Sequence, residues 1–230
     1  MWVKFKINIL KNFIRKIGSY FREIKVDSAR SPENDLLEVV WVNGRKVLNC
    51  SQANYSYGTL YEVFHRTFNE VQLKNVFFDK VLILGYGAGG TAQLLRNEYE
   101  FTGTIDGVEV DEQVIKLAEK HFPDGFKAAD NLYHSDAADF MRQAEKASYD
   151  MVIFDVYVDL HIPEFFQSSR FFQRLNDVLK PGGMLIYNKV MAGRADKQNA
   201  EQIKRAIKNT FTSDAGIFNF EENRMFVARK

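Results

Sequence analysis

Apolar positions follow two different spacings along this chain, and the spacing changes repeatedly after residue 80. The run Val81–Leu84 is short and wholly apolar, which is typical of a strand buried on both faces of a parallel sheet. The residues that follow Gly90 place apolar side chains at helical spacing instead. Repeated alternation of such strands and helices predicts an α/β domain with a doubly wound sheet, in which ligands bind at the carboxyl ends of the strands.

The elements of this domain follow from the same alternation. Strands are expected at about residues 81–86, 103–110, 127–134, 150–156 and 184–190, with helices at about 90–99, 112–121, 138–146, 164–180 and 196–211. The end of the chain contains two further strand-like runs with a turn between them, GIFNF and RMFVARK. These two runs predict an antiparallel pair that closes the sheet.

Three shorter strand-like segments come before this domain, namely REIKVDS, LLEVVWV and KVLNCS. The dipeptide Asn43-Gly44 lies between the last two, and Asn-Gly between apolar runs is the strongest short-range signal of a β-hairpin. The pattern therefore predicts a small antiparallel sheet at about residues 20–52, distinct from the α/β domain.

The first 25 residues are strongly basic, with seven lysines and arginines against one acid, Glu23. Apolar residues recur at helical spacing in this stretch, at Phe13, Ile14, Ile17, Phe21 and Ile24. Part of the segment is therefore expected to form a basic amphipathic helix. The favoured interpretation is a lid that packs on the domain and leaves its basic face in water. The alternative is a weak contact with a membrane surface.

Composition narrows the possible classes of protein. The 230 residues are 46% hydrophobic, which supports a large core, and the formal net charge of +1 gives no argument for nucleic acid as a partner. The single cysteine, Cys50, excludes an internal disulfide and fits a reducing compartment, so a cytoplasmic location is expected. No apolar run approaches the ~18 residues of a membrane span, and lysines interrupt every candidate signal-peptide core.

A glycine motif follows the first strand of the α/β domain. Gly85-x-Gly87-x-x-Gly90 lies between the apolar run and the next helix, where glycine permits positive φ and lets a ligand approach the backbone. Nineteen residues after Gly90, the second strand ends at Glu109, whose carboxylate can accept hydrogen bonds from both hydroxyls of a ribose. The combination predicts a nucleoside site.

Two classes of enzyme share this combination, namely nicotinamide dehydrogenases and S-adenosyl sulfonium transferases. A dehydrogenase usually needs a separate substrate domain, for which this chain leaves no length. Asp136-Ala137 ends the third strand and Asp155 ends the fourth, and a carboxylate at the third strand end can accept from an adenine amino group. These positions favour the sulfonium ligand.

From about Leu37 to its end, the chain resembles the spermidine synthase-like branch of the class I methyltransferase superfamily. The resemblance rests on five motifs, namely VLILGYGAGG, VEVDEQVIKLAEKHF, SDAADF, YDMVIFDVYVD and FFQRLNDVLKPGGMLIYN. It implies a Rossmann-like, seven-stranded methyltransferase sheet with a small N-terminal antiparallel sheet that contributes to a homodimer. The chain is accordingly divided into residues 1–52, with the basic helix and small sheet, and residues 53–230, the nucleoside-binding transferase domain.

The resemblance also implies a donor site and a donor. The donor is S-adenosylmethionine or its decarboxylated form, with Asp136 on the adenine and Glu109 on the ribose. The full set of donor-site residues is Gly85, Gly87, Gly90, Glu109, Val110, Asp136 and Ala137. An alternative role for Asp136 is the N-cap of the next helix, and the two roles are compatible. The histidines and the one cysteine show no metal-ligand spacing, so no metal is expected.

The acceptor in this family is a small amine, and an ammonium must lose a proton before its nitrogen can attack carbon. Asp155 stands where spermidine synthases carry the acid that takes this proton, and Asp159 is the alternative base because the spacing here is one residue longer. Tyr57 matches a tyrosine that helps to hold the amine. These three residues are the expected catalytic set, with Asp155 favoured for its place at the strand end.

Two acids of the family are missing from the chain. Ala88 replaces an aspartate that holds the free amine of the decarboxylated donor, and Thr59 replaces a glutamate that binds the polyamine. A desolvated cation needs a counter-charge, so these losses leave alternatives to aminopropyl transfer open. One alternative is a methyltransferase that uses ordinary S-adenosylmethionine, and the other is a non-catalytic relative that binds a nucleoside. Aminopropyl transfer to an amine, as in polyamine biosynthesis, is the favoured function.

Overall fold

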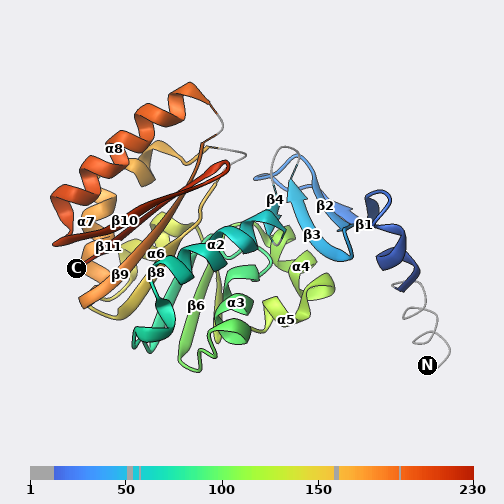
Figure 1. Ribbon diagram of the computed structural model, residues 1–230, viewed down its shortest axis with the longest axis horizontal. Helices are drawn as coiled ribbons and strands as arrows, with labels where there is room; N and C mark the ends of the chain where they lie inside the picture. Colours follow the sequence, from blue (N-terminus) through green and yellow to red (C-terminus); the bar gives the residue numbers. More distant parts are fainter. Residues whose placement is uncertain (1–12, 51–53, 57, 158–160, 192) are drawn as a thin grey trace.

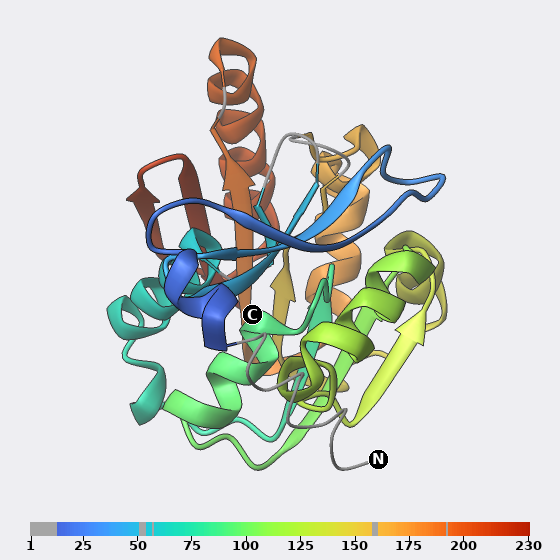
Figure 2. The ribbon, with the colours of Figure 1, turned by 90° about the vertical axis from the view of Figure 1, so that its right-hand side faces the viewer.

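The computed structural model describes residues 13–50, 54–56, 58–157, 161–191 and 193–230. Within these ranges the strands form two sheets, one of four strands and one of seven. Figure 1 shows the small sheet to one side of the large one, and Figure 2 shows its strands crossing in front of the large sheet. The predicted architecture, an α/β domain preceded by a small antiparallel sheet, is confirmed.

The small sheet has the strand order β1-β2-β3-β4 and is antiparallel throughout. Its strands are β1 (Ile24–Ala29), β2 (Leu37–Val42), β3 (Arg45–Cys50) and β4 (Asn54–Ser56). The β2–β3 turn places Asn43 at φ 48° and Gly44 at φ 76°, the two positive values that a type I′ hairpin requires. The predicted hairpin is therefore confirmed. Strand β4 was not expected; the division at residues 52 and 53 stays a prediction, and the sheet extends past it.

The large sheet has the strand order β10-β11-β9-β8-β5-β6-β7. The central pairs from β9 through β7 are parallel, and β11 is antiparallel to both β9 and β10. Its strands are β5 (Lys80–Leu84), β6 (Thr104–Glu109), β7 (Asn131–His134), β8 (Tyr149–Phe154), β9 (Leu179–Val190), β10 (Ser213–Phe220) and β11 (Asn223–Arg229). The expected doubly wound, seven-stranded sheet with an antiparallel closing pair is confirmed.

Helices cover both faces of this sheet. They are α2 (Thr59–Glu70), α3 (Gly90–Glu98), α4 (Glu112–His121), α5 (Pro123–Phe126), α6 (Ala137–Gln143), α7 (Ser169–Val178) and α8 (Arg194–Thr210), with 3-10 turns η1 (Leu73–Asn75) and η2 (Glu164–Gln167). Alternate residues of β5 enter two cores: Val81 and Ile83 pack with α2 and α3, whereas Leu82 and Leu84 pack with α6, α7 and α8. Because β5 is buried on both faces, its run is wholly apolar.

Several boundaries differ from the sequence-based expectation, and the clearest are at β7, which begins at Asn131 rather than near residue 127, and at α7. The short helix α5 occupies part of the stretch before β7, and it starts at Pro123, a residue suited to the first helical position. Helix α7 ends at Val178 rather than at Pro181, because Leu179 already pairs with Tyr149 as the first residue of β9. Neither difference moves a strand end that carries a predicted site residue.

The N-terminal helix does not pack as a lid over the described residues. Residues 13–18 are helical, but Phe13, Ile14 and Ile17 are between 50% and 60% exposed, and Phe21 is 87% exposed. The segment is held instead at the β2–β3 turn, where the Ser19 hydroxyl accepts a hydrogen bond from the backbone of Gly44 (2.8 Å). The lid interpretation is therefore wrong: four of the five apolar residues expected to pack inward are exposed, and the fifth, Ile24, begins β1.

Candidate functional site

The glycine motif forms the turn between β5 and α3. Gly85 has φ 82°, and a Cβ built on it would lie 2.3 Å from the backbone oxygen of Asp155. Any side chain at this position would therefore push β5 away from the end of β8. Gly87 also has a positive φ, 57°, and Gly90 begins α3. The turn is thus compact because glycine permits both its backbone shape and its close contact with the neighbouring strand.

Glu109 reaches from the end of β6 into this turn. Its side chain is buried, and one carboxylate oxygen accepts a hydrogen bond from the backbone N–H of Gly87 (2.8 Å). The other oxygen accepts from the backbone N–H of Asp111 (3.0 Å). The two bonds fix the carboxylate beside the glycine turn. Gly87 and Glu109, which follow the first and end the second strand of one βαβ unit, therefore lie together.

Asp111 links this pair to the small sheet. One of its oxygens caps α4 by accepting from the backbone of Gln113 and Val114. The other accepts from the Ser31 hydroxyl (2.5 Å) and from the Asn34 amide (2.8 Å), both in the loop between β1 and β2. Asp111 is completely buried. Sequence reasoning assigned it no role, although an Asp directly before a helix is a recognised N-cap signal.

Asp136 caps the helix that follows β7. Its carboxylate accepts from the backbone N–H groups of Ala138 (2.6 Å) and Asp139 (3.2 Å), which is the N-cap role considered as an alternative. Asp136 is exposed, whereas Ala137 is buried in the core and begins α6. Val110, which follows Glu109, is 38% exposed at the neighbouring strand end. Their contact with an adenine stays a prediction.

Asp155 lies at the end of β8, against the glycine turn. Its backbone N–H donates to Leu84 (2.8 Å), and its carboxylate accepts a hydrogen bond from the side-chain amide of Asn188 (2.8 Å). Burial, together with the negative charge of Glu109, raises the pKa of Asp155 to about 7. A carboxyl group with such a pKa can both take up and release a proton near neutral pH.

Asn188 is completely buried on β9 and is held in turn by the side-chain amide of Asn223 on β11 (2.9 Å). Sequence reasoning missed this chain of amides, which runs from Asn223 through Asn188 to Asp155. No spacing along the chain brings the three strands together; only the order of the sheet does.

Tyr157 lies two residues beyond Asp155, and its hydroxyl accepts a hydrogen bond from the backbone N–H of Val190 (2.9 Å). Burial and the nearby charge of Asp155 raise its pKa well above the usual tyrosine value, so the hydroxyl stays protonated. Tyr157 was not among the predicted catalytic residues. Of the three that were, Tyr57 and Asp159 lie outside the described residues, and their placement stays a prediction.

Ala88 lies within the glycine turn, but its methyl group faces away from water. It is completely buried and packs in an apolar cluster that joins the small sheet to α4. The cluster consists of Leu37, Val39, Leu48, Cys50, Ala88, Val114, Leu117, Ala118 and Phe122. The position where the resembling family carries an acid is therefore occupied by an apolar contact between two parts of the fold.

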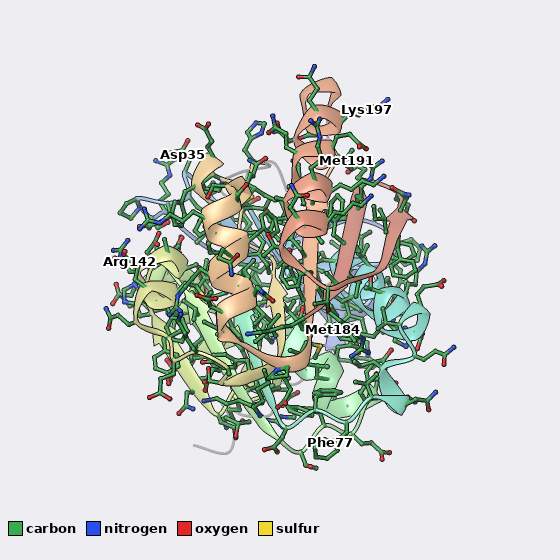
Figure 3. All side chains as sticks on the ribbon, turned by 90° about the vertical axis from the view of Figure 1, so that its left-hand side faces the viewer. Asp35, Phe77, Arg142, Met184, Met191 and Lys197 are labelled. Carbon is green, nitrogen blue, oxygen red and sulfur yellow. The ribbon has the colours of Figure 1, made fainter. Side chains whose placement is uncertain are left out.

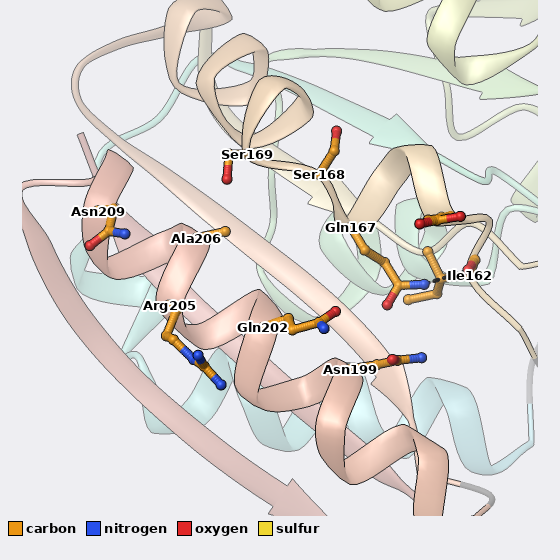
Figure 4. Close-up of a pocket in the computed structure, with 10 residues that line it drawn as sticks. Ile162, Gln167, Ser168, Ser169, Asn199, Gln202, Arg205, Ala206 and Asn209 are labelled. Carbon is orange, nitrogen blue, oxygen red and sulfur yellow. Dashed lines mark hydrogen bonds between the residues drawn. The ribbon is translucent and has the colours of Figure 1, made fainter.

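A polar hollow of about 750 Å³ lies elsewhere, between the η2–α7 segment and α8. Figure 4 shows the side chain of Gln202 on α8 extending toward the side of the hollow that carries Gln167. Its lining residues include none of the predicted donor-site residues.

The described residues lack two further kinds of feature, a metal-binding group and a membrane-spanning helix. They contain no group of three or more His, Cys, Asp or Glu residues arranged to hold a metal ion. None of the helices in the described part of the chain is long and apolar enough to cross a membrane.

The sequence of this chain is similar to the spermine and spermidine synthases. Residues 65–220 match the spermine/spermidine synthase domain. A probable polyamine aminopropyl transferase of Bifidobacterium longum is 31% identical over 141 residues, which cover 61% of this chain and 30% of that protein. A polyamine aminopropyltransferase of Clostridium acetobutylicum is 29% identical over 131 residues, covering 54% of this chain and 45% of that protein. The chain thus spans less than half the length of these curated relatives.

Solved structures show the same fold. A spermidine synthase from Thermotoga maritima superposes with a TM-score of 0.65 at 19% identity, covering 90% of this chain and 72% of that one. Human methyltransferase-like protein 13 in complex with SAH gives a TM-score of 0.61 at 20% identity, covering 75% of this chain and 82% of that one. At these identities the likeness establishes the fold alone.

Proposed function

The chain belongs to the spermine/spermidine synthase family, whose domain matches residues 65–220, and on this premise we propose that it transfers an aminopropyl group from decarboxylated S-adenosylmethionine to a small amine. The observation that supports this proposal best is the pairing of Asp155 with Glu109 beside one glycine turn. The two carboxylates come from different strands and are close enough for the charge of Glu109 to raise the pKa of Asp155.

In this proposal Glu109 binds the donor. Its carboxylate is fixed against the turn by Gly87 and Asp111, and a carboxylate can accept several hydrogen bonds, as the two hydroxyls of a ribose require. Gly85 and Gly90 let the nucleoside approach the backbone. Val110, Asp136 and Ala137 lie at the adjoining strand ends, where we assign them to the adenine.

Asp155 is the proposed proton acceptor. The amine nitrogen attacks the donor carbon next to sulfur, the C–S bond breaks, and its electrons leave with the neutral thioether methylthioadenosine. The proton that the ammonium must lose goes to a carboxylate oxygen of Asp155. The side-chain amide of Asn188 orients the Asp155 carboxylate by donating a hydrogen bond to it (2.8 Å). Tyr57 and Asp159 are assigned to the amine on the family resemblance.

Methyl transfer from ordinary S-adenosylmethionine is a second candidate, favoured by Ala88. The free amine of the decarboxylated donor is a cation, and at this position it finds no carboxylate because the residue is an alanine. Ala88 is also completely buried in an apolar cluster. In relatives that carry an ionised aspartate at this position, that charge would repel the carboxylate of the ordinary donor, and an alanine does not.

Titration calorimetry of the whole chain with both donors and with methylthioadenosine, followed by an assay with diamines, tests these functions. Aminopropyl transfer predicts preference for the decarboxylated donor and formation of methylthioadenosine only when an amine is present. Preference for ordinary S-adenosylmethionine would replace this proposal by methyl transfer. Binding of methylthioadenosine without turnover of either donor would make the chain a non-catalytic relative.

The variant Glu109→Ala supplies the site-specific part of the test. Loss of two hydrogen bonds to a charged acceptor should weaken binding of the decarboxylated donor by about a hundredfold or more. Glu119→Ala, which removes an exposed acid from α4, is the matched control and should bind normally. Equal affinity of the two variants would remove Glu109 from the donor site.

Two further properties of the protein are proposed, one from the family resemblance and one from its cysteine content. We propose that the protein is a homodimer in which the small sheet takes part, and equilibrium sedimentation of the purified chain tests this. A cytoplasmic location also stays a proposal, supported by the single cysteine, Cys50.

A further inference from the structure

Residues 13–25, here called the basic segment, form the most apolar exposed surface in the described part of the chain. Five of the nine large apolar side chains found exposed there belong to it, namely Phe13, Ile14, Ile17, Tyr20 and Phe21. Their exposed fractions run from 50% at Ile17 to 87% at Phe21. Large apolar side chains gathered in this way mark a surface that is covered by something else when the protein works.

The basic segment is amphipathic. Phe13, Ile14 and Ile17 lie on one face of the helical turns at residues 13–18, because each residue advances about 100° around a helix. Arg15 lies on the other side, and Lys16 flanks the apolar face. Arg22 and Lys25 follow the helix, and both are exposed. This combination of an apolar face with basic residues around it is characteristic of helices that lie in a membrane interface.

Positive charge is concentrated at the N-terminal end of the chain. The first 25 residues carry seven bases and one acid, whereas the remaining residues carry 24 bases and 29 acids, a net charge of −5. Two copies of the basic segment would repel each other, which disfavours pairing through it. An anionic surface complements its charge and accepts its apolar side chains at the same time.

Hydrogen bonds hold the basic segment at the β2–β3 turn of the small sheet. Ser19 is buried, its hydroxyl donates to the carbonyl of Lys16 (2.7 Å), and its carbonyl accepts from the backbone of Asn43 (3.0 Å) at the β2–β3 turn. Figure 1 shows these turns at the outer end of the small sheet, on the side opposite α7 and α8.

We propose that the basic segment docks the protein on a membrane surface that contains anionic lipids. The apolar side chains Phe13, Ile17 and Phe21 enter the region between headgroups and acyl chains, and Lys16 and Arg22 contact the anionic headgroups. This docking is independent of the transferase activity, because none of these residues belongs to the donor or acceptor site.

Co-sedimentation of the full chain with lipid vesicles tests the proposal. Vesicles of phosphatidylcholine with about 30% phosphatidylserine should bind the protein, vesicles of phosphatidylcholine alone should bind it at least about tenfold more weakly, and about 0.5 M salt should release it. Absence of binding to the anionic vesicles, or equal binding to both kinds at every salt concentration, would overturn the proposal.

Two variants separate the apolar and charged contributions. The triple change Phe13→Ser, Ile17→Ser and Phe21→Ser should weaken binding at least about tenfold, because the three side chains no longer insert. The double change Lys16→Glu and Arg22→Glu should weaken binding by about fivefold or more for each residue. Both changes affect exposed side chains, so the melting temperature should stay close to that of the original chain.

Control variants change one apolar and one charged side chain on parts of the surface outside the basic segment. Phe77→Ser removes a side chain that is 92% exposed, and Lys197→Glu reverses an exposed charge on α8; Figure 3 labels both residues, far from each other. Both control variants should bind vesicles normally. If the triple variant also binds normally, the segment is not the docking surface. If it instead changes the sedimentation coefficient without lipid, the surface joins two copies of the chain and the proposal fails.

Discussion

Asp155 combines a proposed chemical role with an energetic cost to the native state. Its pKa is raised from 3.8 to about 7, so between these pH values the native state binds more protons than the unfolded state. The free energy of unfolding must therefore fall as pH rises through this window. The cost belongs to the ionised carboxylate, which is also the form that can accept a proton from the amine.

The change Asp155→Asn should separate these two effects. Above pH 7 the variant should be more stable than the original chain, by at most about 4 kcal/mol and by about 2 kcal/mol given that Asp155 is only partly buried, and below pH 4 the advantage should vanish. Denaturant unfolding at several pH values measures the difference. Turnover should fall about 10²–10⁴-fold while donor affinity changes little, and unaltered turnover would exclude Asp155 as the base.

At the level of elements, the contact between β5 and β8 decides where Asp155 lies. A Cβ at Gly85 would meet the Asp155 carbonyl at 2.3 Å, and both partners are backbone, so a strand must move to relieve the contact. Gly182 in β9 has a similar φ, 77°, but nothing lies within 4 Å of its Cβ position. Comparing an alanine substitution at each glycine therefore separates the free-energy cost of the backbone contact at Gly85 from the cost of a positive φ, which both share.

Gly182→Ala should lower the free energy of unfolding by about 1–2 kcal/mol, the usual cost of a left-handed conformation for a residue with a side chain. Gly85→Ala should cost about 2–5 kcal/mol in total and should also lower turnover, because it displaces Asp155. Urea unfolding and a turnover assay measure the two effects. Equal losses in both variants would mean that the turn relaxes without moving β8.

How far the sequence predicts this fold also depends on the element. The apolar run of β5, the glycines after it and Glu109 lie within one βαβ unit, so local patterns were enough to predict that they lie together. The hydrogen bonds from Asn223 to Asn188 and from Asn188 to Asp155 depend on β11, β9 and β8 becoming neighbours in the sheet, which no local pattern indicates. The exposed face of the basic segment was likewise unpredictable, since helical spacing does not reveal what covers a helix.

Across the whole molecule, the small sheet and the large domain are joined through Asp111. Its carboxylate binds Ser31 and Asn34 of the β1–β2 loop, and its backbone N–H binds Glu109. The orientation of the proposed ribose-binding carboxylate therefore depends on how the β1–β2 loop is seated.

Asn34→Ala removes the buried amide from this arrangement and leaves Asp111 with one side-chain donor fewer. We expect a loss of about 1–3 kcal/mol in stability, faster proteolysis between β1 and β2, and a higher KM for the donor. Asp35→Ala changes the exposed neighbour and is the control. Proteolysis that quickens without any change in KM would mean that the loop does not act on Glu109.

The burial of Ala88 has a consequence for how this chain could change its chemistry over evolutionary time. An aspartate introduced there would place a carboxylate against Leu37 and Leu48, where it would lose its hydration and stay neutral or force the two sheets apart. Ala88→Asp alone is therefore not expected to supply an ionised acid beside the donor. Laboratory redesign of donor choice must first replace the apolar neighbours contributed by the small sheet, and only then the residue in the turn.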